Sequence, residues 1–250
     1  IEVLKEIPEN SVDLIFADPS YNLQLQGDLY RPNQTKVNGV NDKWDRFSSF
    51  EEYDQFTHDW LKACRRVLKK DGTIWVIGTY HNIFRVGKIM QDLGFWFLND
   101  VIWVKIDAMP NFNGRRFTNN HETLIWAVKN KNCKEYTFNF ELLKKINGGR
   151  QMKDTDWNFS ICKGSERLKD ENGTKAHPTQ KPLKLVQQVL LTASNKGDLI
   201  LDPFLGSGTT AVAAKTLGRD WIGIEKEKKY VNLAQKRLNT YEVSISQSKQ

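Results

Sequence analysis

The sequence has few cysteines and no long apolar run. Its three cysteines, Cys64, Cys133 and Cys162, are widely spaced. This odd, scattered set argues against a disulfide framework or a zinc site, and it fits a reducing cytosol. No stretch approaches the roughly 20 apolar residues that span a membrane, and no signal peptide is visible. The chain starts at Ile1 without a Met, so we expect a few native residues before it.

What the chain does contain is enough apolar sequence for a core, and an excess of positive charge. Hydrophobic residues make up 39% of its 250 residues, which suffices for one sizeable domain. The net charge is +7, and residues 129–175 hold eleven Lys or Arg against seven Asp or Glu. A basic surface can simply be solvated, but this concentration favours a polyanionic partner such as nucleic acid.

Apolar runs and helical periodicities alternate along much of the chain. Strands are expected at 12–17, 73–77, 95–104, 122–128, 198–201 and 221–224. Helices are expected at 50–68, 82–93, 182–193, 209–217 and 227–238. This alternation predicts a single α/β domain over 1–250 with a doubly wound, mainly parallel sheet. Two segments lack such a pattern: a polar stretch at 22–48, expected to be a mobile loop, and an irregular insertion at 129–176.

The most distinctive turn follows the strand expected at 198–201. Asp202 ends this strand, and the Gly-Ser-Gly turn at 206–208 opens the helix that starts at Thr209. Glycines let the backbone approach a ligand closely, and the free N–H groups of a helix start suit an anion. The next strand ends at Glu225, about 20 residues after the turn, where an acid can accept hydrogen bonds from ribose hydroxyls. The pattern indicates a nucleoside cofactor, and alone it also fits a nicotinamide dehydrogenase.

A second motif, Asp18-Pro19-Ser20-Tyr21, follows the first expected strand, where open α/β sheets place ligands. An amino group on an aromatic base is a poor nucleophile because its lone pair is delocalised into the ring. The Asp18 carboxylate and the Pro19 carbonyl could each accept one of its N–H bonds and so favour a tetrahedral nitrogen. Tyr21 could stack on a base extruded from a duplex. An isolated Asp-Pro is usually an ordinary turn. The motif therefore indicates a catalytic site only in combination with the turn at 206–208.

Together these segments resemble the amino-group DNA methyltransferases. Residues 18–21 resemble motif IV, residues 177–182 (His-Pro-Thr-Gln-Lys-Pro) resemble motif X, and residues 202–209 resemble motif I. The order IV, insertion, X, I is that of the permuted beta group. The resemblance implies a Rossmann-like fold, S-adenosylmethionine as cofactor and no metal. It implies catalytic roles for Asp18, Pro19 and Tyr21. It implies a cofactor site formed by Asp18, His177, Thr179, Asp202, Phe204, Gly206, Ser207, Gly208, Thr209 and Glu225.

A closer resemblance, over about residues 1–240, is to the adenine methyltransferases that recognise GANTC, both the bacterial cell-cycle-regulated type and its restriction-system relatives. The segments that carry it are 22–25, 75–78, 80–85, 109–112, 116–117 and 121–126. This resemblance implies methylation of adenine N6 in double-stranded DNA, in the cytoplasm at the bacterial nucleoid, by a homodimer. It implies a target-recognition role for the insertion at 129–176. The expected DNA contacts are Asn22, Lys36, Arg115 and Arg116.

Two alternatives remain open within this class. Ser20 stands where the family has a second Pro, which would fix the backbone φ. The first alternative is therefore a catalytically weak protein that binds DNA and cofactor. The second is a cytosine N4 methyltransferase, although Asp18 favours adenine because cytosine enzymes often have Ser at this position. A nicotinamide dehydrogenase would leave both the Asp18-Pro19 motif and the segment 177–182 without a role.

Overall fold

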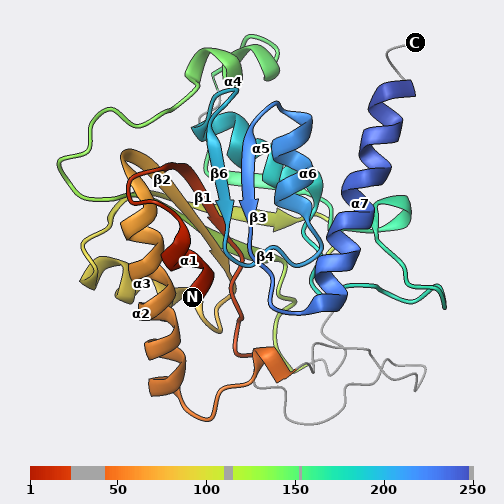
Figure 1. Cartoon of the computed structure of the whole chain (residues 1–250), viewed down its shortest axis with the longest axis horizontal. Helices are drawn as coiled ribbons and strands as arrows, with labels where there is room; N and C mark the ends of the chain where they lie inside the picture. Colours follow the sequence, from red (N-terminus) through yellow and green to blue (C-terminus); the bar gives the residue numbers. More distant parts are fainter. Residues whose placement is uncertain (24–42, 110–114, 152–153, 248–250) are drawn as a thin grey trace.

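The computed structural model describes residues 1–23, 43–109, 115–151 and 154–247. One sheet of seven strands forms its centre, in the spatial order β5-β3-β4-β2-β1-β6-β7 (Figure 1). The strands are β1 (Val12–Ala17), β2 (Leu68–Gly78), β3 (Trp96–Lys105), β4 (His121–Val128), β5 (Asp156–Phe159), β6 (Leu199–Asp202) and β7 (Asp220–Gly223). In this sheet β4 runs antiparallel to β2 and β3, and all other neighbours are parallel. The mainly parallel α/β sheet predicted from the sequence is therefore confirmed.

Helices cover both faces of the sheet (Figure 1). They are α1 (Glu2–Glu6), α2 (Phe50–Val67), α3 (Ile83–Asp92), α4 (Phe140–Ile146), α5 (Leu183–Ala193), α6 (Thr209–Thr216) and α7 (Lys228–Gln247), with short 3-10 turns η1 (Lys43–Asp45) and η2 (Gly164–Glu166). Side chains of α1, α2 and α3 pack on one face of the sheet, and those of α5 and α6 pack on the other. Helix α7 lies beside α6. No helix in the described ranges is long and apolar enough to cross a membrane.

Successive side chains of the central strands pack alternately into two hydrophobic cores, one on each face of the sheet. In β1, Ile15 and Ala17 join the core under α2, whereas Leu14 and Phe16 join the core under α5. Successive side chains of a strand point to opposite faces, and a strand buried on both faces is apolar throughout. This explains why residues 12–17 form a nearly continuous apolar run.

Two features of the sheet differ from the sequence-based expectation. Strand β2 starts at Leu68, five residues before the expected strand at 73–77, because Leu68 already pairs with Val12 of β1, and the register shifts before Thr73 pairs with Leu14. A Cβ at Gly72 would lie 2.9 Å from the Asp13 carbonyl oxygen, so a residue with a side chain could not approach β1 so closely. The stretch 129–176 is also not irregular throughout, since it contains α4 and β5, which pairs with β3.

The order of the strands creates a natural ligand site. The chain runs from β1 to β2 on one side and later returns to place β6 on the other side of β1. The strand order thus reverses between β1 and β6, and ligands of open α/β sheets bind outside the carboxyl ends of the strands at such a point. The Asp18 motif and the turn at 206–208 are both located there by this topology.

The core packing predicts a large loss of stability for Trp75→Ala. Trp75 is fully buried and stacks on Trp126, with ring centroids 5.0 Å apart. We expect the free energy of unfolding to fall by about 3–5 kcal/mol, the usual cost of truncating a buried aromatic residue. Trp96→Ala is the matched control, because Trp96 is 54% exposed and its loss should change stability by less than about 1 kcal/mol. Equal losses in chemical denaturation would contradict the assigned core.

Candidate functional site

A cavity of about 600 Å³ opens at the carboxyl ends of β1 and β6, a size typical of small-molecule sites. Its lining includes the loop after β7 and the segment before α5. Nine of the ten residues expected at the cofactor site line it: Asp18, His177, Thr179, Asp202, Phe204, Gly206, Ser207, Thr209 and Glu225. The expected catalytic residues Pro19 and Tyr21 line it too. Both expected sites are therefore parts of one cavity.

The two glycines of the turn at 206–208 have different tasks. Both have positive φ, +51° at Gly206 and +78° at Gly208, a region that strongly favours glycine. A Cβ at Gly206 would lie 3.0 Å from His177 Nε2, inside the cavity wall. A Cβ at Gly208 would lie 2.9 Å from the Ala234 Cβ of α7. Gly208 was expected to contact the cofactor, but it does not line the cavity. Its lack of a side chain instead allows α7 to pack closely against the turn.

Glu225 fixes the geometry of this turn. Its Oε2 accepts a hydrogen bond from the Gly206 N–H at 2.8 Å, and its Oε1 accepts one from the Glu227 N–H at 2.8 Å. A carboxylate has about four acceptor positions, so both oxygens can still accept hydroxyl groups from the cavity. Glu225 therefore holds the turn against the end of β7 and remains available to a ligand.

Burial shifts the pKa of two titratable groups of the cavity in the direction that favours their neutral forms. Burial raises the pKa of Asp202 to about 7, and the negative charges of Asp18 and Glu225 add to the rise. Burial also lowers the pKa of His177 to about 3, helped by the positive charge of Lys181. The neutral His177 Nδ1 accepts a hydrogen bond from the Thr179 N–H at 3.3 Å.

Arg237 of α7 supports the turn from behind and was not expected from the sequence. Its Nη1 donates to the Ser207 carbonyl at 3.2 Å and to the Thr209 hydroxyl at 2.8 Å. The Thr209 hydroxyl in turn donates to the Lys181 carbonyl at 3.3 Å. These bonds join α7, the start of α6 and the segment before α5, although more than fifty residues separate Lys181 from Arg237.

The Asp18 carboxylate lies in a cluster of buried charges. Lys181 Nζ is 2.6 Å from Asp18 Oδ2, and the Tyr21 hydroxyl is 2.9 Å from Asp18 Oδ1. The same hydroxyl lies 2.9 Å from Glu122 Oε2, and Lys105 Nζ lies 2.8 Å from Glu122 Oε1. Lys105, Glu122 and Lys181 were not expected to take part in the site. Only Lys181 falls within a motif that the sequence singled out for its chemistry.

The backbone after Tyr21 is held by a single carboxylate. Asp45 accepts hydrogen bonds from the N–H groups of Tyr21, Asn22 and Leu23 at 2.7, 2.9 and 3.1 Å. Asn22 has a positive φ of +51°, which Asn tolerates better than most residues. Bonds from backbone N–H groups to an ionised carboxylate are among the stronger ones in proteins, so Asp45 fixes the course of the chain beyond the Asp18 motif.

Ser20 has a hydrogen-bonding role that proline could not have. Its hydroxyl donates to the Trp44 carbonyl at 2.9 Å, and its own carbonyl accepts from the Tyr53 hydroxyl at 2.8 Å. A proline at this position would fix φ through its ring. In this chain the serine hydroxyl instead joins the Asp18 motif to Trp44.

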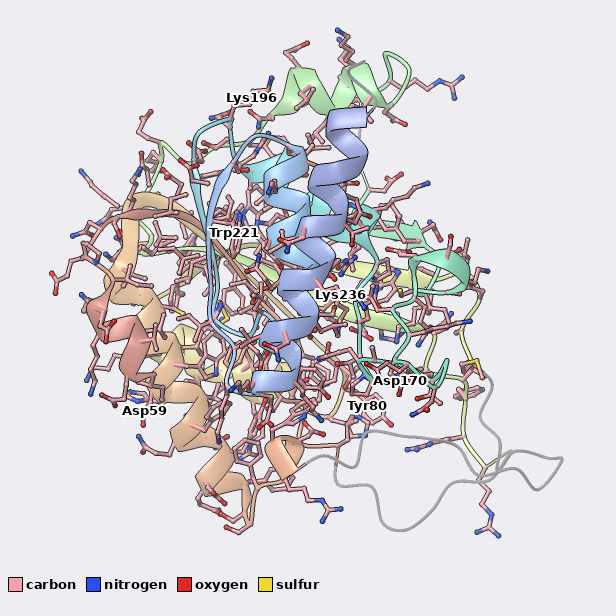
Figure 2. The ribbon with its side chains drawn as sticks, turned by 45° about the vertical axis from the view of Figure 1, so that its right-hand side comes forward. Asp59, Tyr80, Asp170, Lys196, Trp221 and Lys236 are labelled. Atoms are coloured by element: carbon pink, nitrogen blue, oxygen red, sulfur yellow. The ribbon has the colours of Figure 1, made fainter. Side chains whose placement is uncertain are left out.

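The residues expected to contact DNA have mixed locations. Arg115 and Arg116 are exposed, and Arg116 Nη1 donates to the Tyr80 hydroxyl at 3.0 Å. Figure 2 shows Tyr80 at one end of the molecule and Lys196, in the loop before β6, at the other. Lys36 lies outside the described residues. Asn22 was expected to face DNA but is only 4% exposed, and its N–H donates to the buried Asp45 carboxylate.

The stretch 129–176 divides between the two ends of the sheet. Helix α4 lies beyond the amino ends of the central strands, at the opposite end of the sheet from the cavity (Figure 1). There the Asn139 amide donates to carbonyls at the end of α5. The later part returns to the cavity edge, where Gln180 is hydrogen-bonded to Glu166 and Leu168. Within the described ranges, no group of three or more His, Cys, Asp or Glu side chains is placed to hold a metal ion.

The raised pKa of Asp202 predicts a pH-dependent effect of Asp202→Asn on stability. The unfolded carboxyl ionises near pH 3.9, whereas the folded one ionises near pH 7. The wild-type protein therefore loses stability as pH rises from about 4 to 7, and the variant escapes this loss, which is at most about 4 kcal/mol. Thermal unfolding from about pH 4 to pH 8 measures the difference. If the stability of the variant relative to the wild-type protein did not rise with pH, the raised pKa of Asp202 would be contradicted.

Residues 12–236 match the model of the N6_N4_Mtase family, described as DNA methylase. The chain is 53% identical over 238 residues to the Type II methyltransferase M.HinfI of Haemophilus influenzae, which covers 95% of this chain and 66% of that protein. It is 44% identical to the Type II methyltransferase M2.LlaDCHI of Lactococcus lactis subsp. cremoris, over 95% of this chain and 86% of that protein. The chain thus spans slightly less than two thirds of the length of M.HinfI.

Solved structures agree with these matches. A complex of M1.HpyAVI with SAM (S-adenosylmethionine) superimposes with a TM-score of 0.67 at 28% identity, over 95% of each chain. The cytosine-N4-specific PvuII DNA methyltransferase superimposes with a TM-score of 0.69 over 94% of this chain and 82% of that one, but at 20% identity it shows the fold alone. The expected fold class and cofactor are confirmed. The chain belongs to the N6/N4 DNA methylase family of S-adenosylmethionine-dependent methyltransferases.

Proposed function

We propose that the protein transfers the methyl group of S-adenosylmethionine to N6 of adenine in double-stranded DNA, within the sequence GANTC. The observation that carries this proposal is the placement of Asp18 and Tyr21 on the wall of the cavity that Glu225 and Gly206 also line. A group that can accept an amino N–H therefore lies beside a site suited to a nucleoside cofactor.

The lining of the cavity suits this cofactor chemically. Phe204 and Ile224 provide apolar contact for an adenine ring, and Glu225 can accept hydrogen bonds from ribose hydroxyls. The acidic groups Asp18 and Glu225 attract the positive charges of a sulfonium and an ammonium group. When bound, the cofactor supplies an electrophilic methyl carbon.

The chain's own residues prepare the amino group. The Asp18 carboxylate and the Pro19 carbonyl each accept one N–H bond, which localises the nitrogen lone pair for attack on the methyl carbon. Tyr21 provides a ring surface for the extruded adenine, while its hydroxyl is held between two carboxylates. No protein nucleophile would be needed, because the bound cofactor would itself supply the methyl group, and the Asp18 carboxylate would accept the proton that the amino nitrogen releases.

Charge on the exposed surface supports a DNA partner. We propose that Arg115 and Arg116 contact phosphates or guanine edges, and that Lys36 contacts phosphate. The recognition role of 129–176 is assigned to its later part, which returns to the cavity edge, rather than to α4. The homodimer is likewise proposed from the family resemblance.

Cytosine N4 is the second candidate, because the cytosine-N4-specific PvuII enzyme has the same fold. The Asp at position 18 and the segments that resemble GANTC adenine methyltransferases favour adenine. A catalytically weak homologue is less well supported than the sequence suggested, because the Ser20 hydroxyl secures the catalytic motif through its bond to Trp44.

The proposed function predicts methyladenine in a GANTC duplex and none in a scrambled duplex of the same composition. Incubation with labelled S-adenosylmethionine followed by nucleoside analysis measures both. Asp18→Ala should lower turnover at least about 100-fold, in the range of a lost polar catalytic group, and the variant should still bind cofactor. Asp92→Ala, at the exposed end of α3, is the control.

Three results would contradict parts of this proposal. Methylcytosine as the product would show that cytosine, and not adenine, is the target base. Equal methylation of both duplexes would remove the sequence specificity and leave the enzyme class. Wild-type turnover by Asp18→Ala would remove Asp18 from the mechanism.

A further inference from the structure

Five polar side chains meet at the wall of the cavity and are shielded from solvent. Asp18 and Tyr21 follow β1, Lys105 ends β3, Glu122 lies in β4 and Lys181 precedes α5. The side chains of Lys181, Glu122, Lys105 and Asp18 are 7%, 9%, 14% and 17% exposed. Groups from four separate segments thus form one cluster, and only two of them belong to the catalytic motif.

The charges of this cluster balance. Lys181 pairs with Asp18 at 2.6 Å and Lys105 pairs with Glu122 at 2.8 Å. Lys181 Nζ also lies 3.8 Å from Glu122 Oε2, so it serves both carboxylates. Two ammonium groups therefore compensate two carboxylates. Removal of one partner from a buried pair leaves a charge without compensation, which is strongly unfavourable.

The Tyr21 hydroxyl connects the two carboxylates. It lies 2.9 Å from Asp18 Oδ1 and 2.9 Å from Glu122 Oε2, but it carries one proton and can donate to one of them at a time. When Asp18 accepts the amino group of a base, the hydroxyl can donate to Glu122 instead. Glu122 therefore keeps the Tyr21 ring in place while Asp18 changes partners.

We propose that Lys181 and Glu122 are positioning residues of the methyl-transfer site: Lys181 orients Asp18 through Oδ2 and balances its charge, and Glu122 holds the Tyr21 hydroxyl. The inference rests on the proposed role of Asp18 as acceptor for the amino group. Lys105 completes the set by compensating Glu122. Asp18, Tyr21 and Lys181 line the cavity, whereas Lys105 and Glu122 do not and act only through them.

The two positioning residues act on Asp18 with opposite signs. Burial raises the pKa of Asp18, the positive charge of Lys181 lowers it, and the negative charge of Glu122 raises it. Tyr21 donates to the ionised form, and Asp202 is the further carboxyl group whose charge interacts with Asp18. Loss of Lys181 must therefore move the ionisation of Asp18 to higher pH, and loss of the Glu122 charge must move it to lower pH.

The test compares the pH dependence of kcat in Lys181→Met, Glu122→Gln and the double variant. The acid limb is the part of the profile in which kcat rises as Asp18 ionises. We expect this limb to move up in pH by at least about one unit in Lys181→Met, which removes a nearby positive charge. We expect it to move down in Glu122→Gln, which removes a nearby negative charge. The double variant restores the charge balance and should return the limb toward the wild-type position. Lys181→Arg keeps the charge and should leave the limb in place. If Lys181→Met does not fold, the downward shift in Glu122→Gln tests the proposal. Lys88→Met, on the exposed face of α3, is the control.

Shifts of both single variants in the same direction, or no shift in either, would overturn the proposal. The pH at which the thermal unfolding temperature changes should move in the same two directions, and this measurement needs no turnover. A wild-type protein that methylates no duplex, while the unfolding profiles of Lys181→Met and Glu122→Gln shift in opposite directions, would contradict the proposed function. The same result would support the charge balance between Lys181, Glu122 and Asp18.

Discussion

The ion pair between Lys181 and Asp18 is the contact on which the site depends. It joins residues 163 positions apart, one directly after β1 and one directly before α5, at a distance of 2.6 Å. Both side chains are largely buried, so neither charge can be compensated by water if the other is lost. The pair connects the segment expected to act on the base with the segment that, through Thr209, reaches the cofactor turn.

The sheet makes this contact possible because its strand order reverses between β1 and β6. The Asp18 motif and the turn at 206–208 then emerge side by side, and the rest of the fold secures them. Arg237 and Gly208 join α7 to the turn, and Asp45 holds the backbone after Tyr21. The two acceptors proposed for the amino N–H bonds, Asp18 and the Pro19 carbonyl, need rigid support of this kind, since small displacements of reacting groups lower the rate steeply.

Local sequence was sufficient to predict the parts of the site that follow strand ends. The apolar run at 12–17 and the turn at 206–208 fixed the positions of Asp18 and Gly206, because strand ends and glycine turns are local patterns. Lys105 and Glu122 could not be found in this way. They meet because β3 and β4 pair antiparallel, with Val104 opposite His121, and strand register is not encoded in local periodicity. Strand β5 escaped prediction because its four residues alternate polar and aromatic side chains within a polar stretch, without the apolar run that marks the strands expected at 198–201 and 221–224.

The position of the target base relative to Asp18 tests the account most directly. A crystal structure of the protein with a non-reactive cofactor analogue and a GANTC duplex measures it. We predict an extruded adenine with its N6 atom within hydrogen-bond distance of the Asp18 carboxylate and the Pro19 carbonyl, its ring against Tyr21, and Lys181 still bound to Asp18 Oδ2. An extruded cytosine, or an adenine amino group that contacts neither acceptor, would contradict the account.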